Sequence, residues 1–182
     1  MDIGLQPAAW HEFFGLVGTA SAALAGLFFV AISLHFREVE AHPVLRNRAR
    51  LNLQALILFL AISMAVLIPG QSARLVGVEL IVVIVVFLAI ALIGAADMRR
   101  HAASISGVVW IRLLMIGLLG ILGIGAGASL ILGRGPGLYL DVPAIVVGLP
   151  MTGFMAWRVV FPPELGSARP SAKHRSGRAH GK

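Results

Sequence analysis

The run WHEFFGLVGTASAALAGLFFVAISLHF, residues 10–36, decides the fold of this chain. Its central part, 15–34, carries no charged residue, which is enough helix to cross the ~30 Å hydrocarbon core of a bilayer. A signal peptide has a basic segment before its apolar run and a small-residue cleavage site after it. Here Asp2 and Glu12 precede the run and Arg37 follows it. We therefore predict a permanent membrane helix with its N-terminus outside.

The composition of the whole chain also indicates a lipid environment. Of the 182 residues, 58% are hydrophobic and 13% are charged, and the mean hydropathy is +0.91. A soluble chain of this length can bury one core, but it cannot hide five long apolar runs. Cysteine is absent, which excludes disulfides, thiolate metal ligands and cysteine nucleophiles.

Five apolar runs follow one another along the chain, separated by polar or turn-forming segments. Because an open sheet cannot satisfy its edges in lipid, even the valine-rich third run is predicted to be a helix. The expected fold is an all-α transmembrane bundle of five helices over residues 1–161, followed by a disordered basic tail over 162–182. The spans are expected at about 13–35, 51–68, 75–96, 107–132 and 140–161.

The connections between these runs set the topology. Residues 37–50 form a polar connection around Pro43, and the turn Ile68-Pro69-Gly70-Gln71 is so short that the second and third spans must be antiparallel neighbours. Pro150 falls inside the fifth span and is expected to kink it.

The distribution of basic residues predicts the orientation. With the N-terminus outside, 12 of the 15 Lys and Arg residues fall in cytoplasmic segments, whereas only Arg74 and Arg134 fall outside. This asymmetry follows the positive-inside rule, and Trp10 and Tyr139 then lie in an aromatic belt at the outer interface. The C-terminal tail is expected to be cytoplasmic and to lie against anionic headgroups rather than to bind nucleic acid.

Small residues predict close helix packing in the first and fourth spans. In lipid, helices associate where small side chains let their backbones approach, as in small-xxx-small patterns. On this basis the first helix is expected to sit centrally in the bundle. The predicted packing residues are Gly15, Gly18, Ala22, Gly26, Gly120, Gly123 and Gly127.

Four titratable residues, His11, Glu12, Glu79 and Asp141, fall near the outer ends of the spans. Ionisable residues inside a membrane are functional candidates, and convergence of these four would form an entry site for protons or cations. The structural interpretation is favoured. A carboxylate in the first turns of a helix is stabilised by the dipole, and Arg74 or water can reach Glu79. Asp141 is interpreted as the N-cap of the fifth span.

A second polar group is expected near the inner ends of the spans. Arg112 lies in the first turns of the fourth span, where it either extends its guanidinium to the headgroups or pairs with Asp97. Gln54, with Asn52, lies at the same depth in the second span. Polar residues of this kind more often join helices than bind a substrate.

The run from Ala23 to Ser33, the arginine-rich connection after Pro43 and the Ile68-Pro69-Gly70-Gln71 turn carry a resemblance. In these segments the first half of the chain resembles a group of small bacterial integral membrane proteins of unknown function. The resemblance implies a multi-pass protein of the bacterial cytoplasmic (inner) membrane, and it supplies no catalytic residues.

No enzyme signature is legible in the sequence. It contains no HExxH, nucleophile-elbow or Walker motif, and we expect neither a cofactor nor a metal site. The leading hypothesis is a non-enzymatic membrane protein acting through helix–helix association, either with itself as a homo-oligomer or with another membrane protein. The alternative is a small transporter or channel for protons, cations or a small solute that uses intramembrane acids. An intramembrane enzyme has the least support.

Overall fold

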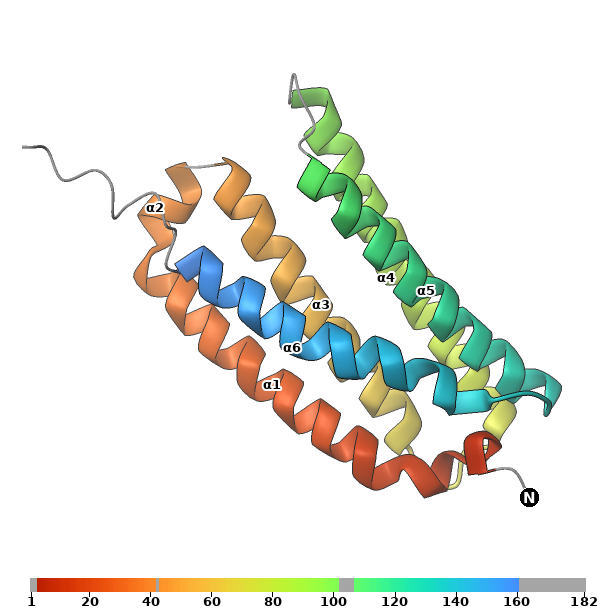
Figure 1. The fold of residues 1–182 in the computed structure, drawn as a ribbon. Coiled ribbons are helices and arrows are strands. Elements are labelled where there is room, and N and C mark those ends of the chain that lie inside the picture. Colours follow the sequence, from red (N-terminus) through yellow and green to blue (C-terminus); the bar gives the residue numbers. More distant parts are fainter. Residues whose placement is uncertain (1–2, 42, 102–106, 161–182) are drawn as a thin grey trace, which may run out of the picture.

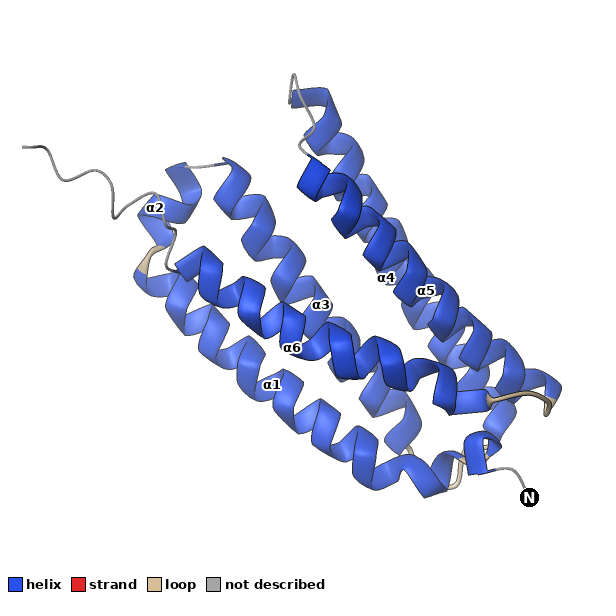
Figure 2. Ribbon diagram, in the orientation of Figure 1, coloured by secondary structure: helices blue, strands red, loops and turns tan. Residues whose placement is uncertain are grey.

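The structure is a computed structural model that describes residues 3–41, 43–101 and 107–160. Within these ranges the chain is helical and contains no strand (Figure 2), which confirms the predicted all-α class. The long helices are α1 (His11–Leu34), α3 (Pro43–Leu67), α4 (Ala73–His101), α5 (Gly107–Leu132) and α6 (Asp141–Val160). The short ones are η1 (Ile3–Leu5), η2 (Pro7–Trp10), α2 (Phe36–Ala41) and η3 (Gly137–Leu140).

Four helical segments of the described chain are long and apolar enough to cross a membrane. They are Pro7–Leu34, Leu45–Leu67, Ala73–Gly94 and Gly137–Trp157, and α5 adds the shorter apolar stretch Ile116–Leu132. Their outward faces carry large apolar side chains such as Leu16, Leu27, Ile93, Leu114 and Ile121, all largely exposed. Water would strongly disfavour such a surface, whereas lipid tails accept it without cost.

Most of the polar connection expected over 37–50 is helical. α2 ends at Ala41, and α3 begins at Pro43 rather than near residue 51. Proline is tolerated in a first turn because its missing N–H has no partner there. Arginine is a good helix former, so the helix continues through the basic residues that follow. The first two turns of α3 therefore carry Arg46, Arg48 and Arg50.

The helices form an α4–α5 hairpin beside a group made by α1, α3 and α6 (Figure 1). The helix with the widest set of neighbours is α3, which contacts α1, α2, α4 and α6. The expectation that the first helix sits centrally is therefore wrong. Small residues mark where a backbone can be approached, but they do not say which helix approaches it.

The α4–α5 hairpin is held by an approach of backbone to backbone. A Cβ atom added to Gly77 would lie 2.5 Å from the carbonyl oxygen of Gly127, and one added to Gly127 would lie 2.7 Å from that of Gly77. Contact this close allows Cα–H···O interactions between the helices. Further along, Gly123 packs on Ile84 and Gly120 lies against Ile84 and Leu88, so the pairing is antiparallel.

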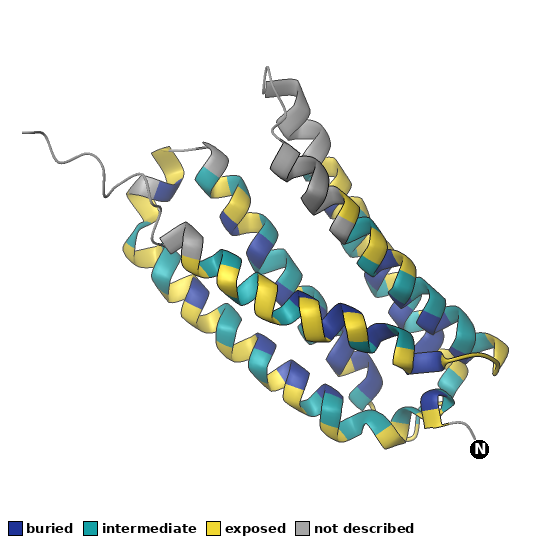
Figure 3. Cartoon of the chain, viewed as in Figure 1, coloured by how far each residue is buried: buried dark blue, intermediate teal, exposed yellow. Residues whose placement is uncertain are grey.

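The buried core is concentrated at one end of the bundle, which we call the aromatic end because Trp10 and Tyr139 lie there. The opposite end, which carries Arg46 and Arg50, is the arginine end. Burial along the helices is visible in Figure 3. The main cluster joins all five long helices and η3 through Phe14, Val17, Phe59, Ile62, Val66, Val76, Leu80, Ile84, Leu130, Leu138 and Ile145. A smaller cluster of Phe28, Val39 and Ala49 lies toward the arginine end.

We predict that Gly127→Ala destabilises the protein because the new methyl group collides with the backbone of α4. Overpacking of this kind costs about 1–3 kcal/mol, which corresponds to a fall of about 2–10 °C in the thermal midpoint of a chain this size. The measurement is thermal unfolding in detergent. Gly117→Ala on the same helix is the control, since a Cβ there meets nothing within 4 Å. Equal midpoints for the two variants would contradict the backbone contact.

Candidate functional site

The aromatic end brings together the first turns of α1, α4 and α6 and the last turns of α3 and α5 (Figure 1). Trp10 ties the N-terminal segment to this end. Its indole Nε1–H donates a hydrogen bond to the Ile3 carbonyl (3.0 Å), and its ring packs edge-on against Tyr139 with centroids 4.8 Å apart. Gly137 has a φ of +57° and lies against the backbone of Gly4, so η1 and η3 pack directly on each other.

Asp141 is the most deeply buried ionisable residue of this end, with 2% of its surface exposed. It opens α6, and Oδ1 reaches α5, where a Cβ on Gly123 would lie 3.1 Å from it. Oδ2 has no hydrogen-bond partner. The absence of a side chain at residue 123 therefore makes room for a carboxyl group that the protein does not fully satisfy.

This geometry differs from the N-cap expected for Asp141. The residue has a right-handed helical backbone (φ −77°, ψ −23°), whereas an N-cap is extended and its side-chain oxygen accepts a bond from the first turn. The α6 dipole favours an anion here by about 0.3–1 kcal/mol. Removing a charge from water costs several kcal/mol, so the dipole does not offset the burial of an ionised carboxylate.

Glu79 lies in the second turn of α4 and is held by a residue outside the helix. Its Oε1 accepts a hydrogen bond of 2.6 Å from Nε2 of Gln71, whereas Arg74 is exposed. The protein partner is therefore the glutamine of the turn that follows Pro69, rather than Arg74, which was one of the two partners considered from the sequence. Glu79 Oε2 and Gln71 Oε1 are buried without hydrogen-bond partners, which leaves two further acceptors unsatisfied at this end.

His11 and Glu12, the other two titratable residues expected at this end, are more accessible than Asp141. Glu12 is exposed and His11 is half-buried in the first turn of α1. Among the side chains that the structure describes, no three His, Asp or Glu residues are grouped so that they could hold a metal ion. Glu79 accepts its hydrogen bond from Gln71 in the turn before α4, whereas Asp141 lies against Gly123 of α5. The aromatic end thus offers two carboxyl groups with different neighbours, each with one buried oxygen that lacks a partner.

Of the polar residues expected near the inner ends of the spans, the structure describes the side chains of Gln54 and Asn52. Gln54 on α3 donates from Nε2 to the Phe87 carbonyl of α4 (3.0 Å), so it joins two helices. Asn52 is 1% exposed on α3. Asp97 lies in α4 and Arg112 in α5, but their side chains, and the predicted pair between them, lie outside the described residues.

The predicted packing residues fall into two groups. The first group faces neighbouring helices and consists of Gly18, Gly120, Gly123 and Gly127. Gly18 of α1 packs against α3, where a Cβ added to it would lie 3.0 Å from the Cβ of Ser63. The second group faces outward on α1: a Cβ at Gly15 or Gly26 would meet nothing within 4 Å, and Ala22 is exposed.

Two features of the site were missed in the sequence. The sequence identifies Gln71 only as part of a turn, and no pattern marks a turn glutamine as the partner of an acid eight residues later. The spacing of Arg46 and Arg50, in contrast, carried a usable signal. Residues four apart share one face of a helix. The pairing of these two arginines therefore follows only once α3 is known to begin at Pro43.

Comparison of the chain with protein-family models, curated proteins and solved structures gives no match. The function is therefore argued from the residues and their geometry.

We predict that Asp141→Asn leaves the fold intact and raises the thermal midpoint in detergent at pH 8. The amide has the shape of the carboxyl group but no charge, and an unsatisfied buried group costs about 1–3 kcal/mol, more when it is charged. Glu12→Gln, which neutralises an exposed acid at the same end, is the control and should leave the midpoint unchanged. A marked fall with Asp141→Asn would mean that the carboxylate is required for folding.

Proposed function

We propose that this chain is a non-enzymatic integral membrane protein that works by self-association through one face of α1. The observation that carries the proposal is a stripe of small residues that no other part of the described chain covers. This α1 stripe consists of Gly15, Thr19, Ala22, Gly26 and Ser33, which share one side of the helix at a spacing of about 100° per residue.

The α1 stripe has the surface that helices use to associate in lipid. Its two hydroxyl groups are satisfied within the helix, Thr19 by the Gly15 carbonyl (2.9 Å) and Ser33 by that of Phe29 (2.8 Å). Neither hydroxyl group of the stripe therefore presents an unmet donor to lipid. Because apolar burial gives no gain between lipid-facing helices, close approach along small residues is the main source of affinity.

A second copy of the chain is the partner that we propose. The opposite face of α1, with Phe14, Val17 and Ser21, is already buried inside the bundle. Two α1 helices meeting stripe to stripe would satisfy a two-fold axis, the commonest symmetry of homo-oligomers. Such a dimer contact would use small residues in the same way as the Gly77–Gly127 contact between α4 and α5, but between two chains.

We also propose five membrane crossings, made by α1, α3, α4, α5 and α6. α5 has 26 residues, which is about 39 Å of helix. It pairs antiparallel with α4 through the glycine contacts, and α4 is itself long and apolar enough to span. A helix that follows a spanning helix in this way crosses the same layer. The basic residues favour an outside N-terminus and a cytoplasmic C-terminus in a bacterial inner membrane.

Single cysteines test the self-association, because the chain has none of its own. We predict that Ala22→Cys, in the α1 stripe, forms a disulfide-linked dimer when membranes are oxidised. Leu27→Cys is the control: Leu27 is 69% exposed but lies about 140° from Ala22 around the helix. Adding Gly26→Ile to the Ala22→Cys chain should abolish the dimer. No dimer at residue 22, or equal yields at 22 and 27, would contradict the proposal.

A second candidate function, transport of protons or cations, is favoured by the unsatisfied carboxyl oxygens of Glu79 and Asp141. Both residues lie inside candidate spans, and each has one buried carboxyl oxygen without a partner. Intramembrane acids are characteristic of ion and proton pathways.

If the chain transports, Glu79→Gln should abolish dissipation of a pH or cation gradient in proteoliposomes. The glutamine can still accept the bond from Gln71, so the fold is retained while the ionisable group is lost. Glu12→Gln should retain the flux. A flux that is unchanged by Glu79→Gln, or no flux in the unmodified protein, would exclude this use of the acid.

A further inference from the structure

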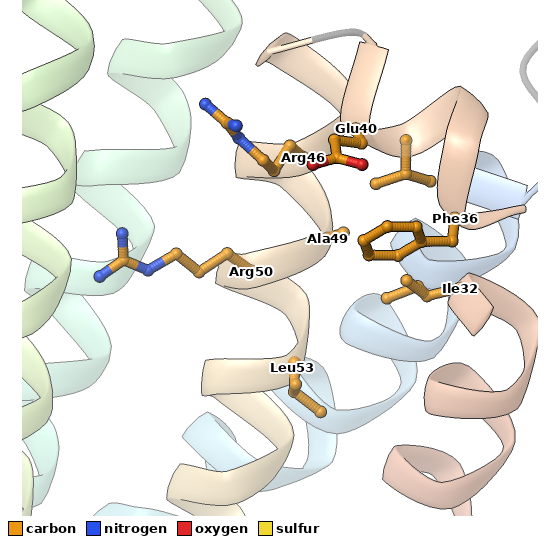
Figure 4. Close-up of a pocket in the computed structure, with 8 residues that line it drawn as sticks. Ile32, Phe36, Glu40, Arg46, Ala49, Arg50 and Leu53 are labelled. Carbon is orange, nitrogen blue, oxygen red and sulfur yellow. The ribbon is translucent and has the colours of Figure 1, made fainter.

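A cavity of about 230 Å³ lies at the arginine end, between α2, the last turns of α1 and the first turns of α3 (Figure 4). Its lining is mostly apolar, with Phe36 57% exposed at one side and Val39 and Ala49 buried beneath. Its charged lining residues are Arg46, Arg50 and Glu40, and its apolar lining is completed by Ile32 and Leu53.

The two arginines are placed to act together. Arg46 and Arg50 are four residues apart and therefore share one face of α3. Figure 4 shows their guanidinium groups extending in the same direction, toward the α4–α5 hairpin. Both side chains are exposed, and neither has a hydrogen-bond or ion-pair partner in the described chain. In this arrangement both groups point away from the Phe36 ring. Because exposed side chains change rotamer rapidly, both can turn back toward a ligand at the cavity.

The electrostatics of α3 favour an anion at this position. The N-terminus of a helix carries a partial positive charge, and acidic residues normally occupy its first turn. In α3 the first turn has no acidic residue, and three arginines follow within two turns. Glu40 is the one carboxylate in the cavity lining, so the lining residues carry two positive charges and one negative charge.

The depth of the arginines identifies the kind of anion. About 32 Å of helix separates Arg46 from Leu67 at the other end of α3, and about 26 Å separates Arg50 from it. These distances bracket the ~30 Å hydrocarbon thickness, so the guanidinium groups lie at the level of lipid phosphates. This step rests on the proposed membrane placement of α3, but not on self-association through α1.

We propose that this cavity binds one anionic phospholipid. The phosphate is held by the guanidinium groups of Arg46 and Arg50, which suit bidentate recognition of phosphate. The first part of an acyl chain lies on Phe36, Ile32 and Leu53. A free phosphate would use only the charged part of the site, whereas a phospholipid uses the arginines and the apolar lining together.

The experiment measures retained lipid by native mass spectrometry after titrating the purified full chain in detergent with phosphatidylglycerol. The test variant is Arg46→Gln with Arg50→Gln. The matched control is Arg37→Gln with Arg48→Gln, which removes the same charge from exposed arginines that do not line the cavity. We expect at least a tenfold weaker retention in the test variant and less than a twofold change in the control.

Three results would overturn the proposal. Equal losses in both double variants would mean diffuse attraction to a basic surface. Equal retention of phosphatidylcholine would mean that the anionic charge is not recognised, and displacement by inorganic phosphate would mean that the lipid chain is not held. Circular dichroism checks folding, and if the double variant does not fold, Arg50→Gln against Arg48→Gln provides the same comparison with one charge removed.

Discussion

Every backbone N–H and C=O group inside a lipid layer must find its partner within the protein, and this constraint governs the whole chain. It explains why even the Val- and Ile-rich segment of α4 is a helix, although the same residues favour a strand in water. It also leaves the helices without a hydrophobic force to bring them together. The close contact between Gly77 and Gly127 supplies van der Waals packing in place of that force, because it lets two helix backbones touch.

The same constraint separates the polar side chains into two kinds. Gln54, Thr19 and Ser33 donate to backbone carbonyls and therefore add no unsatisfied group. Asp141 and Glu79 instead keep acceptors that the protein does not satisfy. Ser21 Oγ and Gln71 Oε1 are also buried without a hydrogen-bond partner, but Asp141 and Glu79 are the ionisable members of this group, and this is why they carry the alternative transport hypothesis.

The two ends of the bundle are chemically different. The aromatic end is closed by Trp10, Tyr139 and the main apolar cluster. Glu79 and Asp141 each keep a buried carboxyl oxygen there. The arginine end has the smaller cluster, exposed guanidinium groups and a cavity. In a bilayer with anionic lipid on one side, the arginine end would lie on that side and the aromatic end on the other. The asymmetry of the fold therefore follows that of the charges in the sequence.

Sequence reasoning was accurate where a physical signal is carried by a continuous run of residues. Apolar length locates all the long helices to within a few residues, except at the start of α3, where the helix continues through the arginines before the apolar run. The partner of each small residue was not predictable: Gly18 meets Ser63 within the chain, whereas Gly15 and Gly26 meet nothing. Nor was the bond from Gln71 to Glu79, because it depends on the path of a turn.

The central claim, that the helices cross lipid five times from an outside N-terminus, is tested most directly by labelling single cysteines in spheroplasts with an impermeant maleimide. Cysteines at Gln6, Ser72 and Arg134 should react in intact spheroplasts. Those at Glu40 and His101 should react only after permeabilisation. Labelling of residues 101 and 134 from the same side would contradict the crossing by α5, and labelling of residue 40 in intact spheroplasts would contradict the orientation.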